Sequence, residues 1–350
     1  MPAAALLAVL AACGGTSDGS DHSQANPALA FGLPRTLVAQ GGAEPALFLE
    51  ASGGGPPIGY IGDDVRVHVL AAPEADRIRI ATDGPLRFTG YLAMTRLVAR
   101  AQARGRLDGA PVYVGPADPV RIVGVDGPWA VVEASPRCAR LEQAGKSLGP
   151  YRGRFPADAL GAERPSGAKA PRAGAWAFFS SDSPTEVHDR PGGRVVAVIP
   201  PVDPPLHATV LKHEGEWTGI RFGDGPYLVG FVRAPLTNAP ADFFPSDEEP
   251  GPVRTPGLPA RLRVDNAKPL WRVHAGAEVR FGDTVVGVLD TPGYARELGR
   301  YPSGDLDAFV AIDDQVAIRG VLRANDVEAL TPPPTERPAK NSPAAPAESL

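Results

Sequence analysis

The sequence predicts an all-β protein built from four small β-barrels in tandem. The main observation is a repeat in which an alternating strand is followed by a short strand that opens at a glycine. Its copies lie at residues 77–80 with Gly90, 129–132 with Gly153, 217–220 with Gly230, and 309–312 with Gly320. The 40 Gly and 40 Pro residues among 350 indicate many turns and short elements. No long helical period is present, and short strands between turn residues are typical of small all-β barrels.

The N-terminal sequence predicts that the protein is anchored to a membrane. Residues 3–12 form a short apolar run that ends at Cys13 and is followed by a polar stretch. The run Leu10-Ala11-Ala12-Cys13 resembles the lipobox of bacterial lipoproteins. The resemblance implies a signal peptide at 1–12 and lipidation of Cys13, although no Lys or Arg precedes Ala3. By the same resemblance, Gly14 in place of Asp implies the outer membrane if the cell is Gram-negative, with the protein facing the periplasm or the cell surface.

Residues 13–34 are expected to be a disordered tether, since they are polar and rich in small residues. The first barrel is expected at 35–97 and the second at 98–160, each closed by a short turn of helix. Alternation at residues 65–70 puts one face of a strand in a core. Residues 135–150 form a longer stretch than their counterpart in the first barrel and are expected to form an excursion loop.

The second half of the chain repeats the pattern after a Pro/Gly-rich linker at 161–174. The third barrel is expected at 175–238, a second linker at 239–257, and the fourth barrel at 258–330. Without a clear linker between them, the first two barrels should pack together, whereas the third and fourth should be more independent. The Pro-rich tail at 331–350 lacks core residues and is expected to be disordered.

The repeated motifs resemble bacterial SH3-like (SH3b) domains, which carry Gly-x-Trp-x-x-Val and Gly-Trp-Val signatures. The third unit matches best, through residues 215–220 and Gly230-Phe231-Val232. The other units depart from the pattern: Arg77 and Phe309 replace the Trp, and the second unit ends Gly153-Arg154-Phe155. The resemblance covers most of the chain and implies four SH3-like barrels; another small all-β repeat is the alternative.

Composition and motifs argue against several function classes. A net charge of −5 without a basic cluster disfavours a nucleic-acid partner. No run of 18 apolar residues exists, so no membrane-spanning helix is expected. His207 and His213 do not have a recognisable zinc spacing, and no catalytic or phosphate-binding motif is present. We therefore expect no enzyme activity, no metal and no cofactor. Cys138 is expected to be an unpaired loop thiol.

The candidate ligand-binding residues are the aromatic side chains Trp129, Trp217, Tyr227 and Trp271. In small barrels such residues, together with Phe309, mostly fill the core, which is the simpler expectation. The sharper hypothesis is a partly exposed aromatic groove for an extended peptide or glycan strand.

Three functions follow from these observations. The favoured one is a lipid-anchored, non-enzymatic envelope protein that binds peptidoglycan or another envelope protein. The second is an envelope hydrolase with accessory SH3-like units. It would need a catalytic domain, and the sequence leaves no unassigned segment longer than the linkers, which counts against it. The third is a structural subunit of an envelope assembly, which large apolar patches on the barrels would support.

Overall fold

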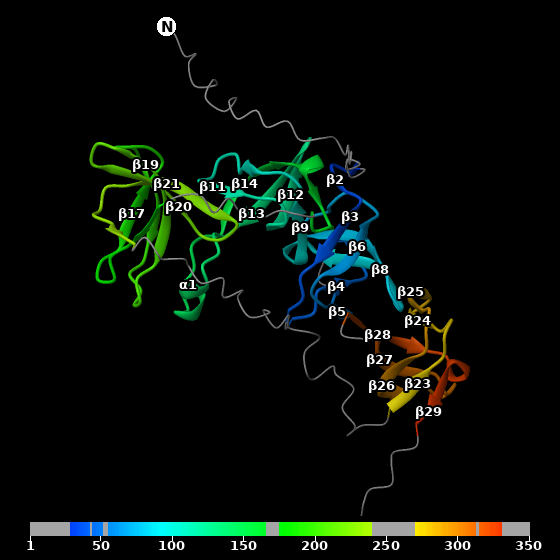
Figure 1. Ribbon diagram of the computed structural model, residues 1–350. Helices are drawn as coiled ribbons and strands as arrows, with labels where there is room; N and C mark the ends of the chain where they lie inside the picture. The colour runs from blue at the N-terminus through cyan, green and yellow to red at the C-terminus, as the bar shows by residue number, and fades with distance from the viewer. Residues whose placement is uncertain are drawn as a thin grey trace, which may run out of the picture.

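The computed structural model describes residues 29–42, 44–51, 55–165, 175–239, 270–312 and 315–330 (Figure 1). The signal peptide, Cys13, most of the tether, most of both linkers, the start of the fourth barrel and the tail lie outside these residues. The described residues form an all-β structure that includes a small six-strand barrel and further sheet. The predicted all-β class is therefore confirmed.

Four units follow one another along the chain. The first contains β3 (Thr36–Ala39), β4 (Leu47–Phe48), β5 (Gly59–Ile61), β6 (Val65–Val69), β7 (Arg77–Thr82), β8 (Leu86–Ala93), η1 (Met94–Arg96) and β9 (Leu97–Ala101). The second contains β9 again, β10 (Gly105–Arg106), β11 (Val112–Val114), β12 (Pro119–Asp126), β13 (Trp129–Ala134), α1 (Ala139–Gln143), β14 (Tyr151–Pro156), η2 (Ala157–Ala159) and β15 (Leu160–Gly161).

The other two units repeat this order. The third contains β16 (Ala175–Phe178), β17 (Thr185–His188), β18 (Val195–Ile199), β19 (His207–Glu214), β20 (Trp217–Phe222), β21 (Tyr227–Val232) and β22 (Thr237–Asn238). The fourth contains β23 (Leu270–Val273), β24 (Glu278–Phe281), β25 (Thr284–Leu289), β26 (Gly293–Arg300), β27 (Leu306–Ile312), β28 (Val316–Leu322), η4 (Ala324–Asp326) and β29 (Val327–Ala329).

All four units share one strand order. In the third unit β22 pairs with β16, β16 with β19, β19 with β20, and β20 with β21. A hairpin is inserted between the first two strands of each meander: β4–β5, β10–β11, β17–β18 and β24–β25. We call these the inserted hairpins. The last long strand of each meander carries the repeated glycine, so β8, β14, β21 and β28 are called the glycine strands.

The repeated glycines allow two backbones to approach closely. A Cβ added to Gly90, Gly153, Gly230 or Gly320 would lie 2.7 or 2.8 Å from a carbonyl oxygen of the inserted hairpin region. Those oxygens belong to Phe48, Asp108, His188 and Arg280. Real Cβ atoms do not come that close, so only glycine fits where the hairpin crosses the glycine strand. This explains why the sequence repeat contains a glycine at this point.

The expected boundary between the first two units lies inside one strand. Leu97 and Val98 of β9 pair with β3 and close the first unit. Residues 98–101 of β9 pair with β12 and β15 and open the second unit. A shared strand explains why no linker separates these units in the sequence. At the N-terminal end, residues 29–34 form the β1 (Leu29–Ala30) and β2 (Leu33–Pro34) hairpin, which differs from the expected tether because Leu33 is fully buried.

The units do not lie in sequence order. The third unit contacts the second through β21 and β11, the second shares β9 with the first, and the fourth pairs with the first. Figure 1 shows the third and fourth units at opposite ends of the described part of the molecule. The prediction that these two units are more independent than the first two needs correction, because strand pairing across unit boundaries ties each of them to another unit.

The first and fourth units exchange strands in both directions. Strand β5 of the first unit pairs with β28, and β25 of the fourth unit pairs with β8. With β4 and β24 these strands form the closed six-strand ring β8–β25–β24–β28–β5–β4. One buried core cluster accordingly contains residues of the first, second and fourth units, and another contains those of the third.

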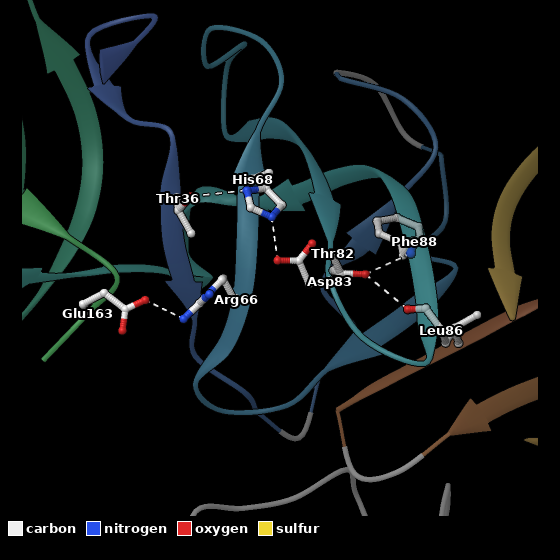
Figure 2. Close-up of polar contacts among 8 residues, drawn as sticks. All are labelled: Thr36, Arg66, His68, Thr82, Asp83, Leu86, Phe88 and Glu163. Atoms are coloured by element: carbon white, nitrogen blue, oxygen red, sulfur yellow. Dashed lines mark hydrogen bonds and ion pairs between the residues drawn. The ribbon is translucent and has the colours of Figure 1, made fainter. Parts of the chain in front are cut away.

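Side-chain contacts hold the hairpin that receives β25 (Figure 2). The buried Thr82 hydroxyl donates to the Leu86 carbonyl at 3.3 Å and accepts the Phe88 N–H at 2.9 Å. His68 lies across the neighbouring strand, with Nε2 2.6 Å from Asp83 Oδ2 and Nδ1 3.3 Å from Thr36 Oγ1. These contacts fix the first half of β8, which is the part that pairs with the fourth unit.

Candidate functional site

The junction between the second and third units begins as a strand addition. Val112 and Tyr113 of β11 pair with Leu228 and Tyr227 of β21. The Val229 N–H also donates to the Pro111 carbonyl at 3.3 Å. A single sheet, β10–β11–β21–β20–β19–β16–β22, therefore runs across the two units.

The predicted excursion loop makes the second contact between these units. Residues 135–150 contain the short helix α1, and Leu141 and Leu148 are buried in the core cluster of the third unit. The Arg140 guanidinium donates to the Pro205 carbonyl at 2.9 Å, and Lys146 Nζ donates to the Pro201 carbonyl at 2.8 Å. The excursion thus supplies apolar residues to a neighbouring core, which sequence position alone did not indicate.

A groove of about 260 Å³ lies at this junction. The second unit contributes Arg106, Pro111 and Tyr113 to its lining. The third unit contributes Leu211, Lys212, Val229 and Phe231, with Asp189 and two glycines. Tyr227, Val229 and Phe231 alternate along β21 and are all half-buried, whereas Leu228 is fully buried. The groove therefore lies on the outer face of the shared sheet.

Aromatic rings and cations alternate along this face. Tyr113 and Tyr227 stack with ring centroids 5.7 Å apart and planes 9° apart. The Arg106 guanidinium lies 6.0 Å from the Tyr113 ring centroid, and Arg221 lies 5.6 Å from that of Tyr227. Lys212 Nζ lies 5.0 Å from the Phe231 centroid. Rings and guanidinium groups held in this way offer flat apolar contact together with hydrogen-bond donors.

A half-buried carboxyl, that of Asp118, also lies at this junction. Burial raises the pKa of Asp118 from 3.8 to about 6, although the Gly115 N–H donates to Oδ2 at 2.7 Å and the Arg137 cation is nearby. A Cβ on Gly225 would lie 3.0 Å from the Asp118 carboxyl carbon, so the third unit presses its turn onto this group. Arg137 continues the contact: its carbonyl accepts the Asp224 N–H at 3.0 Å.

Two other titratable groups at the junction have shifted pKa values. Burial raises the pKa of the free Cys138 thiol, which counts against a reactive thiolate at neutral pH. Burial also lowers the pKa of His207, so its imidazole is neutral at pH 7. Within the described residues, no group of three or more His, Cys, Asp or Glu side chains is arranged to hold a metal ion.

The structure does not bring the four predicted aromatic residues together. Trp129 opens β13 in the second unit and is 38% exposed. In the third unit Trp217 packs edge to face with His188, and their ring centroids are 4.8 Å apart. Trp271 donates from Nε1 to Glu297 at 2.9 Å in the fourth unit, with Arg300 4.5 Å from its ring. Tyr227 does not line the groove itself but stacks on Tyr113, which does.

None of these residues is fully buried in a core, although Trp271 packs against the main core cluster and Phe309 packs against Tyr60 and Ala317. Trp217, Tyr227, Trp271 and Phe309 are half-buried, and Trp129 is exposed. The core positions are taken by smaller aliphatic side chains and by Phe88, Phe155 and Phe222. Trp129 and Trp217 are the first residues of β13 and β20, which leaves them at the ends of their strands.

Sequence reasoning also missed Arg106, Tyr113 and Phe231. Tyr113 carried a usable signal, since it occupies the same place in its repeat as Tyr60, and both begin contacts with another unit. The location of the groove depends on which units pair, and a repeat pattern does not contain that information.

Among the described residues, no helix has the length and apolarity needed to cross a membrane. The chain matches no protein-family model, and no curated protein and no solved structure shows significant similarity to it.

Proposed function

We propose that this chain is a lipid-anchored, non-enzymatic binding protein of the bacterial envelope, whose four units are SH3-like barrels. The proposed location in the envelope is based on the resemblance of Leu10-Ala11-Ala12-Cys13 to a lipobox. Acylation of Cys13 would hold the protein on the membrane, because each buried lipid methylene contributes about 0.8 kcal/mol.

The common strand order supports the SH3-like assignment. Each unit is a five-strand meander whose last strand returns to pair with the first, with a hairpin inserted after the first strand. A short 3-10 turn precedes the closing strand in the first, second and fourth units. The repeated glycine has the same structural reason in every unit, as expected for copies of one domain type.

The groove at the junction of the second and third units is the observation that carries the binding function. It combines flat rings, two cations and an apolar floor on one outer sheet face. These features suit an extended polymer that offers apolar faces and hydrogen-bond acceptors, such as a peptidoglycan strand with its stem peptides. The raised pKa of the Cys138 thiol also favours a binding role over nucleophilic catalysis.

The experiment is a pull-down of the purified protein on peptidoglycan sacculi. The Tyr113→Ala variant removes the ring shared by the groove and the Tyr113–Tyr227 stack, and should lower the retained fraction at least about tenfold if the ring contributes about 1.5 kcal/mol. Trp129→Ala is the matched control, since this exposed ring lies away from the groove lining. Circular dichroism spectra of the two variants serve as the control for folding.

Equal loss in both variants, or no retention of the wild-type protein, would contradict the cell-wall proposal. In the second case the envelope-assembly role is the alternative, and one observation favours it: β18 carries exposed apolar side chains, including Val195 and Val198.

A further inference from the structure

The second strands of the inserted hairpins are the elements through which units join. In the first unit Ile61, Tyr60 and Gly59 of β5 pair with Val316, Ala317 and Ile318 of β28. In the fourth unit, residues 287–289 of β25 pair with residues 86–88 of β8. In the second unit β11 pairs with β21. In each case the partner is the first half of a glycine strand of another unit.

Strand β18 is the equivalent element of the third unit. Its register with β17 matches the register of β25 with β24: Val187 pairs with Ala197 as Val279 pairs with Gly287, and a bulge follows in both hairpins. Residues 197–199 therefore correspond to residues 287–289, which pair with β8. Among the described residues, β18 pairs with β17 and with no other strand.

The open edge is apolar. β18 reads Val195-Val196-Ala197-Val198-Ile199, with no charged residue and four β-branched side chains. Val195 is 44% exposed and Val198 is 47% exposed, whereas Ala197 and Ile199 face the core of the third unit. Proteins usually protect such edges with charges, prolines or a covering element, because an open edge pairs readily with another strand.

Among the described strands of the same chain, none is left to cover this edge. The first halves of β8, β28 and β21 already pair with β25, β5 and β11. The first half of β14 follows Pro150, which has no N–H to donate to a ladder, and β14 carries Arg152 and Arg154. A second copy of this chain offers one matching apolar edge within the described residues, and that edge is β18 itself.

We propose that two copies of this chain dimerise through antiparallel pairing of β18 with β18 about a two-fold axis. This contact is isologous, so it closes at two subunits. It places Val195 and Val198 of both copies on one shared surface and covers the last open hairpin edge. The inference is independent of the groove and of the ligand proposed for it.

The test is sedimentation equilibrium on the full chain carrying Cys13→Ser, which removes the acylation site. The weight-average mass should rise from monomer toward dimer between about 1 and about 300 µM. Val198→Lys puts two cations opposite an apolar strand and should raise the dimer dissociation constant at least about tenfold. The side chain is exposed, so this substitution should leave the monomer folded.

Val285→Lys is the matched control. Val285 has the same register position in the fourth unit as Val195 has in β18, and it is 37% exposed, but its strand already pairs with β8. This variant should dimerise as the wild type does. Hydrogen exchange adds a local readout: the amides of 195–199 should gain protection at high concentration, while those of 287–289 stay protected at both concentrations.

A mass that stays monomeric over the whole range would overturn the proposal. So would an equal effect of the two lysine substitutions, or association without protection of 195–199. Monomeric wild-type protein would instead point to a strand of a different protein as the occupant of this edge.

Discussion

The two junctions between units differ in how many strands they exchange. The first and fourth units each give a hairpin strand to the glycine strand of the other, and matching hydrogen bonds flank both pairings. The Gly62 N–H donates to the Gln315 carbonyl at 2.6 Å, and the Asp290 N–H donates to the Pro85 carbonyl at 2.8 Å. The second and third units use one such pairing, while the excursion around α1 supplies the second contact.

This difference teaches how one contact type yields either a closed structural core or an accessible site. We call the contact between the first and fourth units the reciprocal junction, because each unit gives a strand to the other. There Tyr60 is buried with Ala317, and Phe309 packs against them. We call the contact between the second and third units the one-sided junction, because only the second unit gives a hairpin strand. There the equivalent Tyr113 is half-buried, stacks on Tyr227 and lines the groove. The reciprocal exchange closes a ring, whereas the one-sided exchange leaves a groove and an open β18 edge.

The largest effect is expected from breaking the reciprocal junction. Gly59→Val would push a side chain into the Ala317 carbonyl and the Ile318 side chain, whose Cγ2 lies 2.8 Å from the position of a Cβ. Overpacking against backbone cannot relax, so we expect a loss of about 4 kcal/mol in the free energy of unfolding, measured by urea titration.

Gly299→Val is the control for this change, because a Cβ at Gly299 has no neighbour within 4 Å. Its loss should be about 1 kcal/mol or less. Similar losses for both variants would mean that β5 and β28 are not packed together.

The one-sided junction should break when the excursion loses its anchor. Leu141 is 1% exposed and belongs to the core cluster of the third unit. Leu141→Ala should cost about 3 kcal/mol through lost burial and the remaining cavity. Limited proteolysis should then cleave the excursion at 135–150 faster than in the wild type, while the first and fourth units keep their resistance. Unchanged proteolysis would show that the excursion is not docked.

The smallest effect is a pH dependence confined to the one-sided junction. Because burial raises the pKa of Asp118 from 3.8 to about 6, the folded protein holds its proton more tightly than the unfolded chain. The resulting stabilisation is fully present below pH 3.8 and is lost as the pH rises through 6. After screening of this half-buried group by solvent, the change amounts to about 1 kcal/mol.

Asp118→Asn should remove this pH dependence and retain the bond from the Gly115 N–H. At pH 7.5 the variant should be more stable than the wild type by about 1 kcal/mol, and at pH 4 the two should be equal. Urea titrations at the two pH values measure the difference. A wild-type advantage at pH 7.5 would mean that the ionised carboxylate stabilises the junction.

The sequence repeat predicted the strands well because their alternation and glycines reflect contacts inside one unit. Gly230, for example, leaves room for the carbonyl oxygen of His188 in its own unit, where a Cβ would collide with it. The junctions were not predictable in the same way. Tyr60 and Tyr113 look alike in sequence, yet one is covered by the fourth unit and the other lines a groove. Their difference arises from pairings between residues more than a hundred positions apart along the chain.

The predicted aromatic site failed for a related reason. Trp129 and Trp217 hold the same place in their repeats, and Trp271 lies on the first strand of the fourth unit; the contacts of each are with its own unit. A shared site requires units to meet face to face, and only Tyr227 lies where they do. Cys13 lies outside the described residues, so its lipidation stays a prediction.

A cross-link between β8 and β25 tests most directly whether inserted hairpins join the units. Arg87 and Val288 are direct partners in this antiparallel pair, which puts their Cα atoms about 5 Å apart, within disulfide range. In a Cys13→Ser, Cys138→Ser background, Arg87→Cys with Val288→Cys should form an intramolecular disulfide on mild oxidation, detected by mass spectrometry. Arg87→Cys with Val285→Cys, three residues out of register, should not. Failure of the first pair, or equal cross-linking of both, would contradict the strand exchange.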